Sequence, residues 1–226
     1  MKTSITKTNT LEKRRRIARI VQTLKRLYPK VKSELHYETP MQFLACVIFS
    51  AQFTDVGVNR LTETLWKKYK TVDDFANTTP EKFAQEIKTI SYYNGKAKYV
   101  VLSARIIRDE FQGVIPSDKG QLLRLPGVAS KTANVVLGEL YGIFDGIAVD
   151  THVKRFVRKF DICESTNADI IERELCALVP KKDWKYVNNG LVLYGRYACK
   201  AQVHDCKSHA LTLLWPEAGS RWPRAA

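Results

Sequence analysis

The sequence predicts an all-α protein, and three observations predict it. Apolar side chains recur three and four positions apart through most of the 226 residues, which is the spacing of one face of a helix. Thr, Asp and Asn residues that can cap a helix stand before several of these apolar stripes. No segment sustains the alternation of apolar and polar residues that a half-buried strand needs.

Cap residues and apolar stripes define the helices expected up to residue 113. Asn9-Thr10-Leu11-Glu12 has the form of a capping box and precedes a stripe from Ile17 to Tyr28. Thr39-Pro40 supplies a cap and an N1 proline ahead of the apolar run 43–49. Asp55 is expected to cap the next helix. Two more stripes follow: Phe83, Ile87 and Ile90 after Thr79-Pro80, then Val100, Ala104, Ile107 and Phe111, which Gly113 closes.

Beyond residue 113 the same signals continue. A Pro126-Gly127 break separates a short apolar segment from a helix over about Ser130 to Leu140. Asp150 can cap a helix, and Thr166-Asn167-Ala168-Asp169 has capping-box form before another. A last helix is expected over roughly 187–197. Short helices joined by tight turns, without a long linker or an internal repeat, are typical of an all-α fold.

The positive charge is concentrated at the N-terminus. The chain holds 37 Lys and Arg against 23 Asp and Glu, a formal net charge of +14. Residues 1–32 contain eleven of those cations and a single acid, and Arg14, Arg15 and Arg16 lie in their densest run. Such an arm is typical of proteins that bind nucleic acid. A solvated helix face that aids solubility is the other interpretation.

Composition excludes several classes of protein. With 45% hydrophobic and 27% charged residues, the chain is neither wholly disordered nor fibrous. No apolar run reaches the ~18–20 residues that span a bilayer, and the charged N-terminus is not typical of a secretory signal. Five cysteines, an odd number, suit a reducing interior. We therefore expect a cytoplasmic protein, associated with the nucleoid if its source is bacterial.

The segment from Leu125 to Val136 carries the most information about function. Gly127 allows the turn to take positive φ without steric cost. The free N–H groups at the start of the following helix, around Val128, Ala129 and Ser130, can then hold a phosphate together with the helix dipole. A helix-hairpin-helix grips a DNA backbone in this way without reading its sequence. An ordinary turn between two helices is the alternative.

Two charged residues near this segment are candidates for catalysis. Lys131 lies in the first turn of the helix, where the dipole and contact with a ligand favour a neutral, nucleophilic amine. A lysine that contacts phosphate or solvent is the alternative. Asp150 is either a helix cap or a catalytic carboxylate, and it can be both. His152 is either a residue of the same site or a surface side chain beside the cap.

Four motifs together resemble the endonuclease III family of helix-hairpin-helix DNA glycosylases. They are Ser50-Ala51-Gln52-Phe53-Thr54-Asp55, the hairpin Leu125–Val136, Val149-Asp150-Thr151-His152, and Gly195-Arg196-Tyr197-Ala198-Cys199. The resemblance implies two helical domains with a DNA groove between them. One is a six-helix barrel over 34–145 that contains the hairpin. The other combines 1–33 with 146–226.

The same resemblance implies an activity and roles for residues. The chain is expected to remove oxidised pyrimidines from duplex DNA as a bifunctional glycosylase and AP lyase, and to act as a monomer. Lys131 matches the nucleophile of the family and Asp150 its essential aspartate. Gln52 matches the residue that fills the gap left by the flipped nucleotide, and Tyr92 stands where the family has an intercalating leucine. The hairpin from Gly127 to Ser130, His152 and the arginine run are expected to contact DNA.

The cysteines depart from the family pattern. The family ends in C-x6-C-x2-C-x5-C, which holds a four-iron four-sulfur cluster. Here Cys199 and Cys206 keep the first spacing, but His209 and Trp215 stand at the third and fourth positions. Tryptophan cannot ligate iron, so we expect neither a cluster nor another metal. Instead we expect a tail packed by Leu211, Leu213, Leu214 and Trp215. Zinc on Cys199, Cys206, His209 and His204 is the alternative, and a disulfide between the two cysteines is a lesser one.

Other features leave the substrate open. The hairpin has Ala129 where the family usually has a second glycine, and Tyr92 is flatter and bulkier than leucine. The same fold could act on abasic sites alone, on an oxidised purine or on a mismatch. A non-catalytic DNA-binding protein is the rival from another class, and the presence of both Lys131 and Asp150 argues against it.

Overall fold

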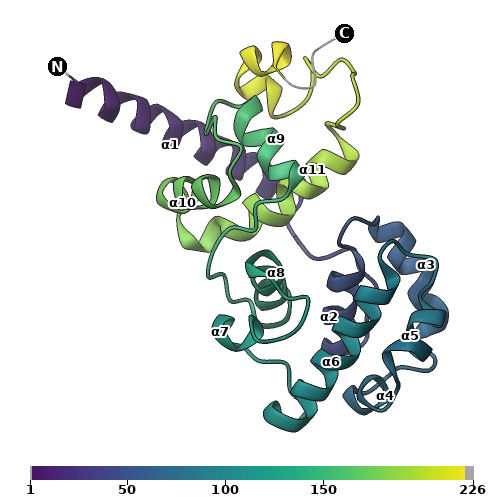
Figure 1. Cartoon of the computed structure of the whole chain (residues 1–226). Helices are drawn as coiled ribbons and strands as arrows, with labels where there is room; N and C mark the ends of the chain where they lie inside the picture. The colour runs from purple at the N-terminus through teal and green to yellow at the C-terminus, as the bar shows by residue number, and fades with distance from the viewer. Residues whose placement is uncertain (1, 222–226) are drawn as a thin grey trace. The chain divides into compact units, whose positions relative to one another are not determined.

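The computed structural model describes residues 2–221 of the chain and the side chains of residues 10–221. Within residues 2–221 the regular structure is helical and no strand is present (Figure 1), which confirms the predicted fold class. The chain forms two compact units. The central unit spans Ser33–Asp145, and the terminal unit combines the residues up to Lys32 with those from Gly146 onward. No helix in the described range is long and apolar enough to cross a membrane.

The central unit is built around its longest helix, α6 (Tyr93–Phe111). Three other helices, α2 (Pro40–Phe49), α4 (Val72–Ala76) and α5 (Pro80–Glu86), pack against α6, and α2 also contacts α8 (Ser130–Tyr141). Figure 1 shows these helices in the blue and teal part of the chain. The remaining helices of the unit are α3 (Asp55–Leu65) and α7 (Lys119–Leu122).

Helix α2 anchors the core of the central unit. Thr39 caps it as predicted, because its hydroxyl accepts a hydrogen bond from the Gln42 N–H while the Gln42 side chain accepts one from the Thr39 N–H at 3.1 Å. The Gln42 amide also donates to the Tyr69 carbonyl at 2.9 Å, so this buried polar group is satisfied. Four phenylalanines of this core have no exposed surface: Phe43 and Phe49 of α2, Phe75 of α4 and Phe83 of α5. Each such burial contributes about 1.5–3 kcal/mol.

The terminal unit joins the two ends of the chain. Helix α1 (Lys2–Leu27) packs against α10 (Ala168–Leu178) and against a single π-helical turn, η2 (Tyr186–Gly190), while α9 (Thr151–Lys159) packs against α11 (Leu191–Tyr197). The predicted α1 stripe is confirmed from Ile17 to Leu24, whereas Leu27, the last residue of the helix, is 44% exposed. Short 3-10 turns complete the unit: η1 (Lys181–Asp183), η3 (Thr212–Leu214) and η4 (Pro216–Ser220).

Three predicted helix starts are wrong. Helix α1 begins at Lys2, so the Asn9–Glu12 pattern lies inside it, and residues 2–8 contain no Pro or Gly that would end a helix there. Thr54 caps α3 by accepting from the Gly57 N–H, which leaves Asp55 as the first helical residue. A capping box over residues 166–169 would make Thr166 the cap of α10. The cap is instead Asn167, whose side chain accepts hydrogen bonds from the Asp169 and Ile170 N–H groups. A carboxylate at the first helical position still stabilises the positive end of the helix dipole, which makes the two positions hard to distinguish by sequence.

Candidate nucleic-acid interface and active-site residues

The hairpin of the central unit is a tight turn between α7 and α8. Gly127 has φ of +78°, in the left-handed region, and a Cβ at this position would lie 2.8 Å from the ring of Tyr99. The turn is tied to α6 by a hydrogen bond of 3.0 Å that the Ser103 hydroxyl donates to the Pro126 carbonyl. Both the backbone angle and the aromatic ring therefore require glycine here.

The N-terminus of α8 is open to a ligand. Its N-cap residue, Ala129, provides no side-chain hydrogen bond, so no cap side chain competes for the first N–H groups of the helix. Lys131 lies in this first turn, and Val128 is buried below it while Ala129, Ser130 and Lys131 are exposed. The N–H groups of a helix N-terminus, the positive end of the helix dipole and an exposed ammonium are features that can together accommodate a phosphate group.

The loops that carry Gln52 and Tyr92 are strained and joined to each other. Both residues have left-handed backbone angles, with φ of 55° and 57°. The Ser91 hydroxyl donates a hydrogen bond of 2.9 Å to the Gln52 carbonyl. Tyr92 is 70% exposed. Residues other than glycine avoid this conformation at a cost of about 1 kcal/mol or more, and such residues cluster at functional sites.

A hollow of about 540 Å³ in the central unit brings these segments together. Its lining includes Gln52 from one loop, Tyr92 from a second and Gly127 from the hairpin, together with Tyr99 and Lys96 of α6. The Lys96 side chain is buried and donates to the Phe49 carbonyl at 2.8 Å, and burial lowers the pKa of its amine. The sequence prediction missed Lys96 and Tyr99. The signal that could have identified Lys96 is its position one helical turn before Val100, on a buried face of the helix.

In the terminal unit, Asp150 caps α9 as predicted. Its carboxylate accepts a hydrogen bond of 2.8 Å from the Val153 N–H, and the side chain remains partly exposed. His152 lies against Gly195 of α11, where a Cβ would collide with the imidazole ring. The Gly195 motif thus makes room for His152. The cap interpretation of Asp150 holds, and the cap uses one oxygen of the carboxylate, Oδ1.

The three arginines of the run on α1, Arg14 to Arg16, differ in the contacts that they make. Arg16 donates to the Phe160 and Asp161 carbonyls and forms an ion pair of 3.0 Å with the Asp161 carboxylate. Its guanidinium carbon also lies 4.1 Å from the centre of the Trp215 ring. Arg14 and Arg15 are exposed, although Arg14 makes one bond, to the Ala177 carbonyl. The Arg16 side chain therefore stabilises the terminal unit through these contacts, in place of the DNA contact that the sequence predicted for it. The side chains of Lys2 and Lys7, also counted in the basic arm, lie outside the described residues.

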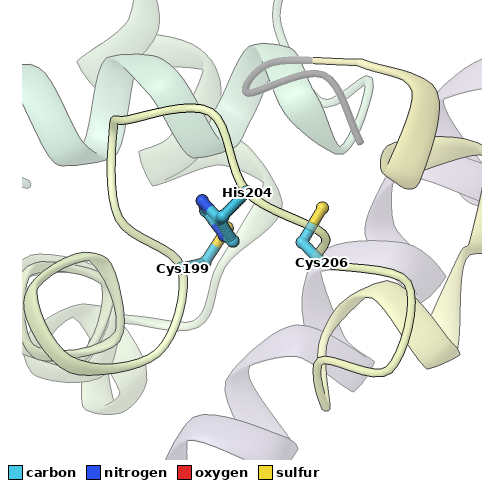
Figure 2. Close-up of side chains that lie close together, drawn as sticks. All are labelled: Cys199, His204 and Cys206. Atoms are coloured by element: carbon cyan, nitrogen blue, oxygen red, sulfur yellow. The ribbon is translucent and has the colours of Figure 1, made fainter. Parts of the chain in front are cut away.

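The C-terminal cysteine loop gathers a smaller set of ligands than the family's cluster needs. Figure 2 shows Cys199, His204 and Cys206 close together, with ligand atoms within 4.8 Å of one another. No further cysteine joins this group among the described side chains, and none of the five cysteines forms a disulfide. Trp215, at the fourth ligand position, lies against Arg16 and Arg221. Two thiols and an indole do not fit a four-thiolate iron–sulfur cluster.

Buried cations surround these thiols. The fully buried Lys159 amine lies 3.1 Å from the Cys206 sulfur, and the Arg155 guanidinium donates to the Cys199 carbonyl at 2.7 Å. Burial raises the pKa of the Cys199 thiol, against the opposing effect of Lys159 and Arg155. Burial and the neighbouring His204 lower the pKa of His209. Of the predicted tail residues, Leu211 is buried and Leu214 and Trp215 pack partly, but Leu213 is 66% exposed. The prediction for Leu213 is wrong, because η3 turns that residue outward.

The fold and the hairpin define a class of helical DNA-repair proteins. Residues 45–181 match the HhH-GPD superfamily of base excision DNA repair proteins. The chain is 38% identical over 196 residues to endonuclease III of Bacillus subtilis, which covers 86% of this chain and 89% of that protein. It is 35% identical over 189 residues to endonuclease III of Escherichia coli, covering 84% and 89%.

Solved structures agree with these relatives. A non-covalent endonuclease III–DNA complex superposes with a TM-score of 0.84 at 33% identity, covering 92% of this chain and 97% of that one. A trapped endonuclease III–DNA covalent intermediate gives a TM-score of 0.83 with the same identity and coverage. A thermostable thymine-DNA glycosylase shares the fold at 22% identity, with a TM-score of 0.74. The chain belongs to the endonuclease III family of the HhH-GPD superfamily.

Proposed function

We propose that this chain is a base excision repair enzyme, a DNA glycosylase with AP lyase activity that acts on oxidised pyrimidines in duplex DNA. One observation carries the proposal: Lys131 is exposed in the first turn of α8, whose N-terminus has no capping side chain and follows the Gly127 turn. The N–H groups hold a phosphate while the lysine reaches the sugar beside it. The enzyme works as a monomer in the compartment that holds DNA, on the nucleoid of a bacterial cell.

The reaction requires the damaged nucleotide to leave the base stack, at a cost of a few kcal/mol. The neutral Lys131 amine attacks C1′ of its sugar, the bond from C1′ to the base breaks, and the base takes that electron pair. Ring opening then gives an imine between Lys131 and C1′. Loss of a C2′ proton expels the 3′ phosphate by β-elimination, which cuts the strand.

Asp150 supplies the negative charge that this sequence needs. Its carboxylate stabilises the positive charge that develops on the sugar and accepts the proton released by Lys131. The hydrogen bond from the Val153 N–H fixes the carboxylate through one oxygen. The helix cap is therefore the device that positions the catalytic group.

Gln52 and Tyr92 keep the DNA open in this proposal. The exposed Tyr92 ring wedges into the stack, and the Gln52 amide hydrogen-bonds to the base left without a partner. Their positions on the rim of one hollow, with Gly127, support a common role. His152, packed over Gly195, and the exposed Arg14 and Arg15 add contacts to the DNA backbone.

We further propose that the chain lacks the iron–sulfur cluster of its family. The support is the donor set, since Cys199 and Cys206 are accompanied by His204 rather than by two more thiols. Purified protein should have no visible absorbance and no acid-labile sulfide. A brown protein would contradict this part of the proposal and would leave the role of Lys131 untouched.

Borohydride trapping on a duplex with one abasic site tests the catalytic assignment. The wild-type chain should form a covalent adduct, and Lys131→Ala should form none. Lys131→Arg is the decisive variant, because arginine keeps the charge for a phosphate but cannot form an imine. It should bind the duplex and fail to be trapped. Lys82→Ala, which removes another exposed lysine of the central unit, is the matched control and should react normally. A covalent adduct between Lys131→Arg and the abasic duplex would contradict the assignment of Lys131 as the nucleophile.

A further inference from the structure

The loop after α11 holds two buried thiols that the proposed repair chemistry does not use. Cys199 follows the end of α11 and is 1% exposed, and Cys206 has no exposed surface. His204 of the same loop approaches both, so that one ligand atom from each residue lies within 4.8 Å of the others (Figure 2). Two sulfurs and an imidazole at this separation are a nearly assembled metal site.

The hydrogen bonding of His204 prepares it as a ligand. Its Nδ1 lies 2.7 Å from the Gln202 carbonyl oxygen. A carbonyl oxygen only accepts, so Nδ1 carries the proton and Nε2 carries the lone pair. Nε2 is buried and has no hydrogen-bond partner among the described residues. A histidine held by a carbonyl through one nitrogen, with the other nitrogen bare, is the arrangement that metal-binding histidines adopt.

His209 offers a fourth ligand. Its ring stacks on that of His204, with centroids 5.2 Å apart and an angle of 27° between the planes. The backbone N–H of His209 donates a hydrogen bond of 3.1 Å to the backbone carbonyl of Cys206, which holds the two residues in one turn. The Nδ1 atom of His209 is also buried without a hydrogen-bond partner in the described part of the chain. Two buried imidazole nitrogens without partners in one loop are costly unless something binds them.

We propose that Cys199, His204, Cys206 and His209 bind one zinc ion, which replaces the iron–sulfur cluster of the family as the staple of this loop. Two thiolates and two neutral imidazoles balance the charge of Zn²⁺ and match its tetrahedral preference. With Zn–S bonds of about 2.3 Å the two sulfurs of a tetrahedral site lie roughly 3.8 Å apart, a separation that falls inside the 4.8 Å within which the three ligand atoms already lie. This proposal revises the expectation, made on sequence spacing, that the tail binds no metal.

The surroundings of the site suit a structural role. Lys159 donates to the Cys206 sulfur at 3.1 Å, and a donor to a ligand sulfur stabilises its thiolate form. Arg155 holds the carbonyls of Cys199 and Lys200, at 2.7 and 3.0 Å, which fixes the start of the loop. Four protein ligands leave no open position for a substrate, so the ion would cross-link the loop after α11 rather than take part in catalysis.

Metal analysis of the full chain, purified without affinity tags that bind metal, tests the proposal. We expect about one zinc ion per chain and no acid-labile sulfide. Cys206→Ser and His204→Gln should each lower the zinc content at least about tenfold. Cys176→Ser removes a cysteine of α10 that lies outside the cluster, and it should keep its zinc. Zinc below about 0.1 per chain, or iron with sulfide, would overturn the proposal.

Cobalt substitution decides the question without any variant, in case a variant fails to fold. Co²⁺ added to the zinc-free wild-type chain should give the intense visible bands of a tetrahedral site and the near-ultraviolet bands of thiolate ligation. Zinc should displace both. A spectrum of octahedral cobalt, without thiolate bands, would contradict the ligand set. The result is independent of glycosylase activity, so the two proposals fail separately.

Discussion

Ser91 and Gln52, 39 positions apart in the sequence, are joined by a hydrogen bond of 2.9 Å from the Ser91 hydroxyl to the Gln52 carbonyl. The bond links two loops whose adjoining residues, Gln52 and Tyr92, are both held in left-handed conformations. Strain of this kind persists only where surrounding structure enforces it. The Ser91 bond is one such restraint, and it ties together the two loops whose side chains we propose enter the DNA.

Relieving the left-handed backbone strain at Tyr92 should stabilise the chain and at the same time lower its activity. Tyr92→Gly relieves the left-handed cost and should raise the free energy of unfolding by up to about 1 kcal/mol. Base excision should fall, because the wedge is lost. Gln112, which caps α6 at φ of 54°, provides the control. Gln112→Gly should stabilise the chain similarly and leave excision unchanged. Urea denaturation and a duplex cleavage assay measure the two effects, and equal loss of activity in both variants would refute the assignment.

Gly127→Ala should damage the hairpin beyond the cost of its backbone angle. Gly113 has nearly the same φ, +77°, but a Cβ there meets nothing within 4 Å. Gly113→Ala should therefore lose about 1 kcal/mol of stability. Gly127→Ala should lose about 1–3 kcal/mol more, because its methyl group meets the Tyr99 ring. Addition of Tyr99→Ala should recover part of that difference. Thermal unfolding of the four proteins distinguishes these costs, and equal destabilisation by the two glycine variants would show that the ring yields freely.

The two roles of Asp150 can be separated by one pair of variants. Asparagine caps a helix about as well as aspartate but carries no charge. Asp150→Asn should therefore keep the stability of the wild type and lower the rate of base excision by roughly 10²–10⁴-fold. Asp150→Ala should lose about 1 kcal/mol of stability in addition. Single-turnover excision with denaturation curves checks both, and an active Asp150→Asn enzyme would reduce Asp150 to a cap.

Arg16 and Arg15 should respond differently to substitution. Arg16→Ala removes the ion pair to Asp161 and the stack on Trp215, and should cost about 1–2 kcal/mol of stability. Arg15→Ala should leave stability within about 0.5 kcal/mol and instead weaken DNA binding, with a salt slope shallower by about one. Binding titrations at several salt concentrations are the measurement. An unchanged slope for Arg15→Ala would show that this side chain is only solvated surface.

The sequence by itself determined what depends on neighbours along the chain. The cap at Thr39 needs only Gln42, three positions away, and the cap at Asp150 needs only Val153. The helical spacing of apolar residues was enough to predict the fold class. The motifs around Lys131 and Asp150 were enough to indicate the family, because each is a short run of adjacent residues.

Only the tertiary structure decided which distant groups meet. Arg16 belongs to a basic run, yet it forms an ion pair with Asp161 and stacks on Trp215. No local sequence pattern distinguishes it from Arg15. Likewise His204 shows no ligand spacing in the sequence, and its role emerges from one carbonyl contact and two thiols. Caps and stripes are encoded within a few residues, whereas the partners of a side chain depend on how the loops fold back.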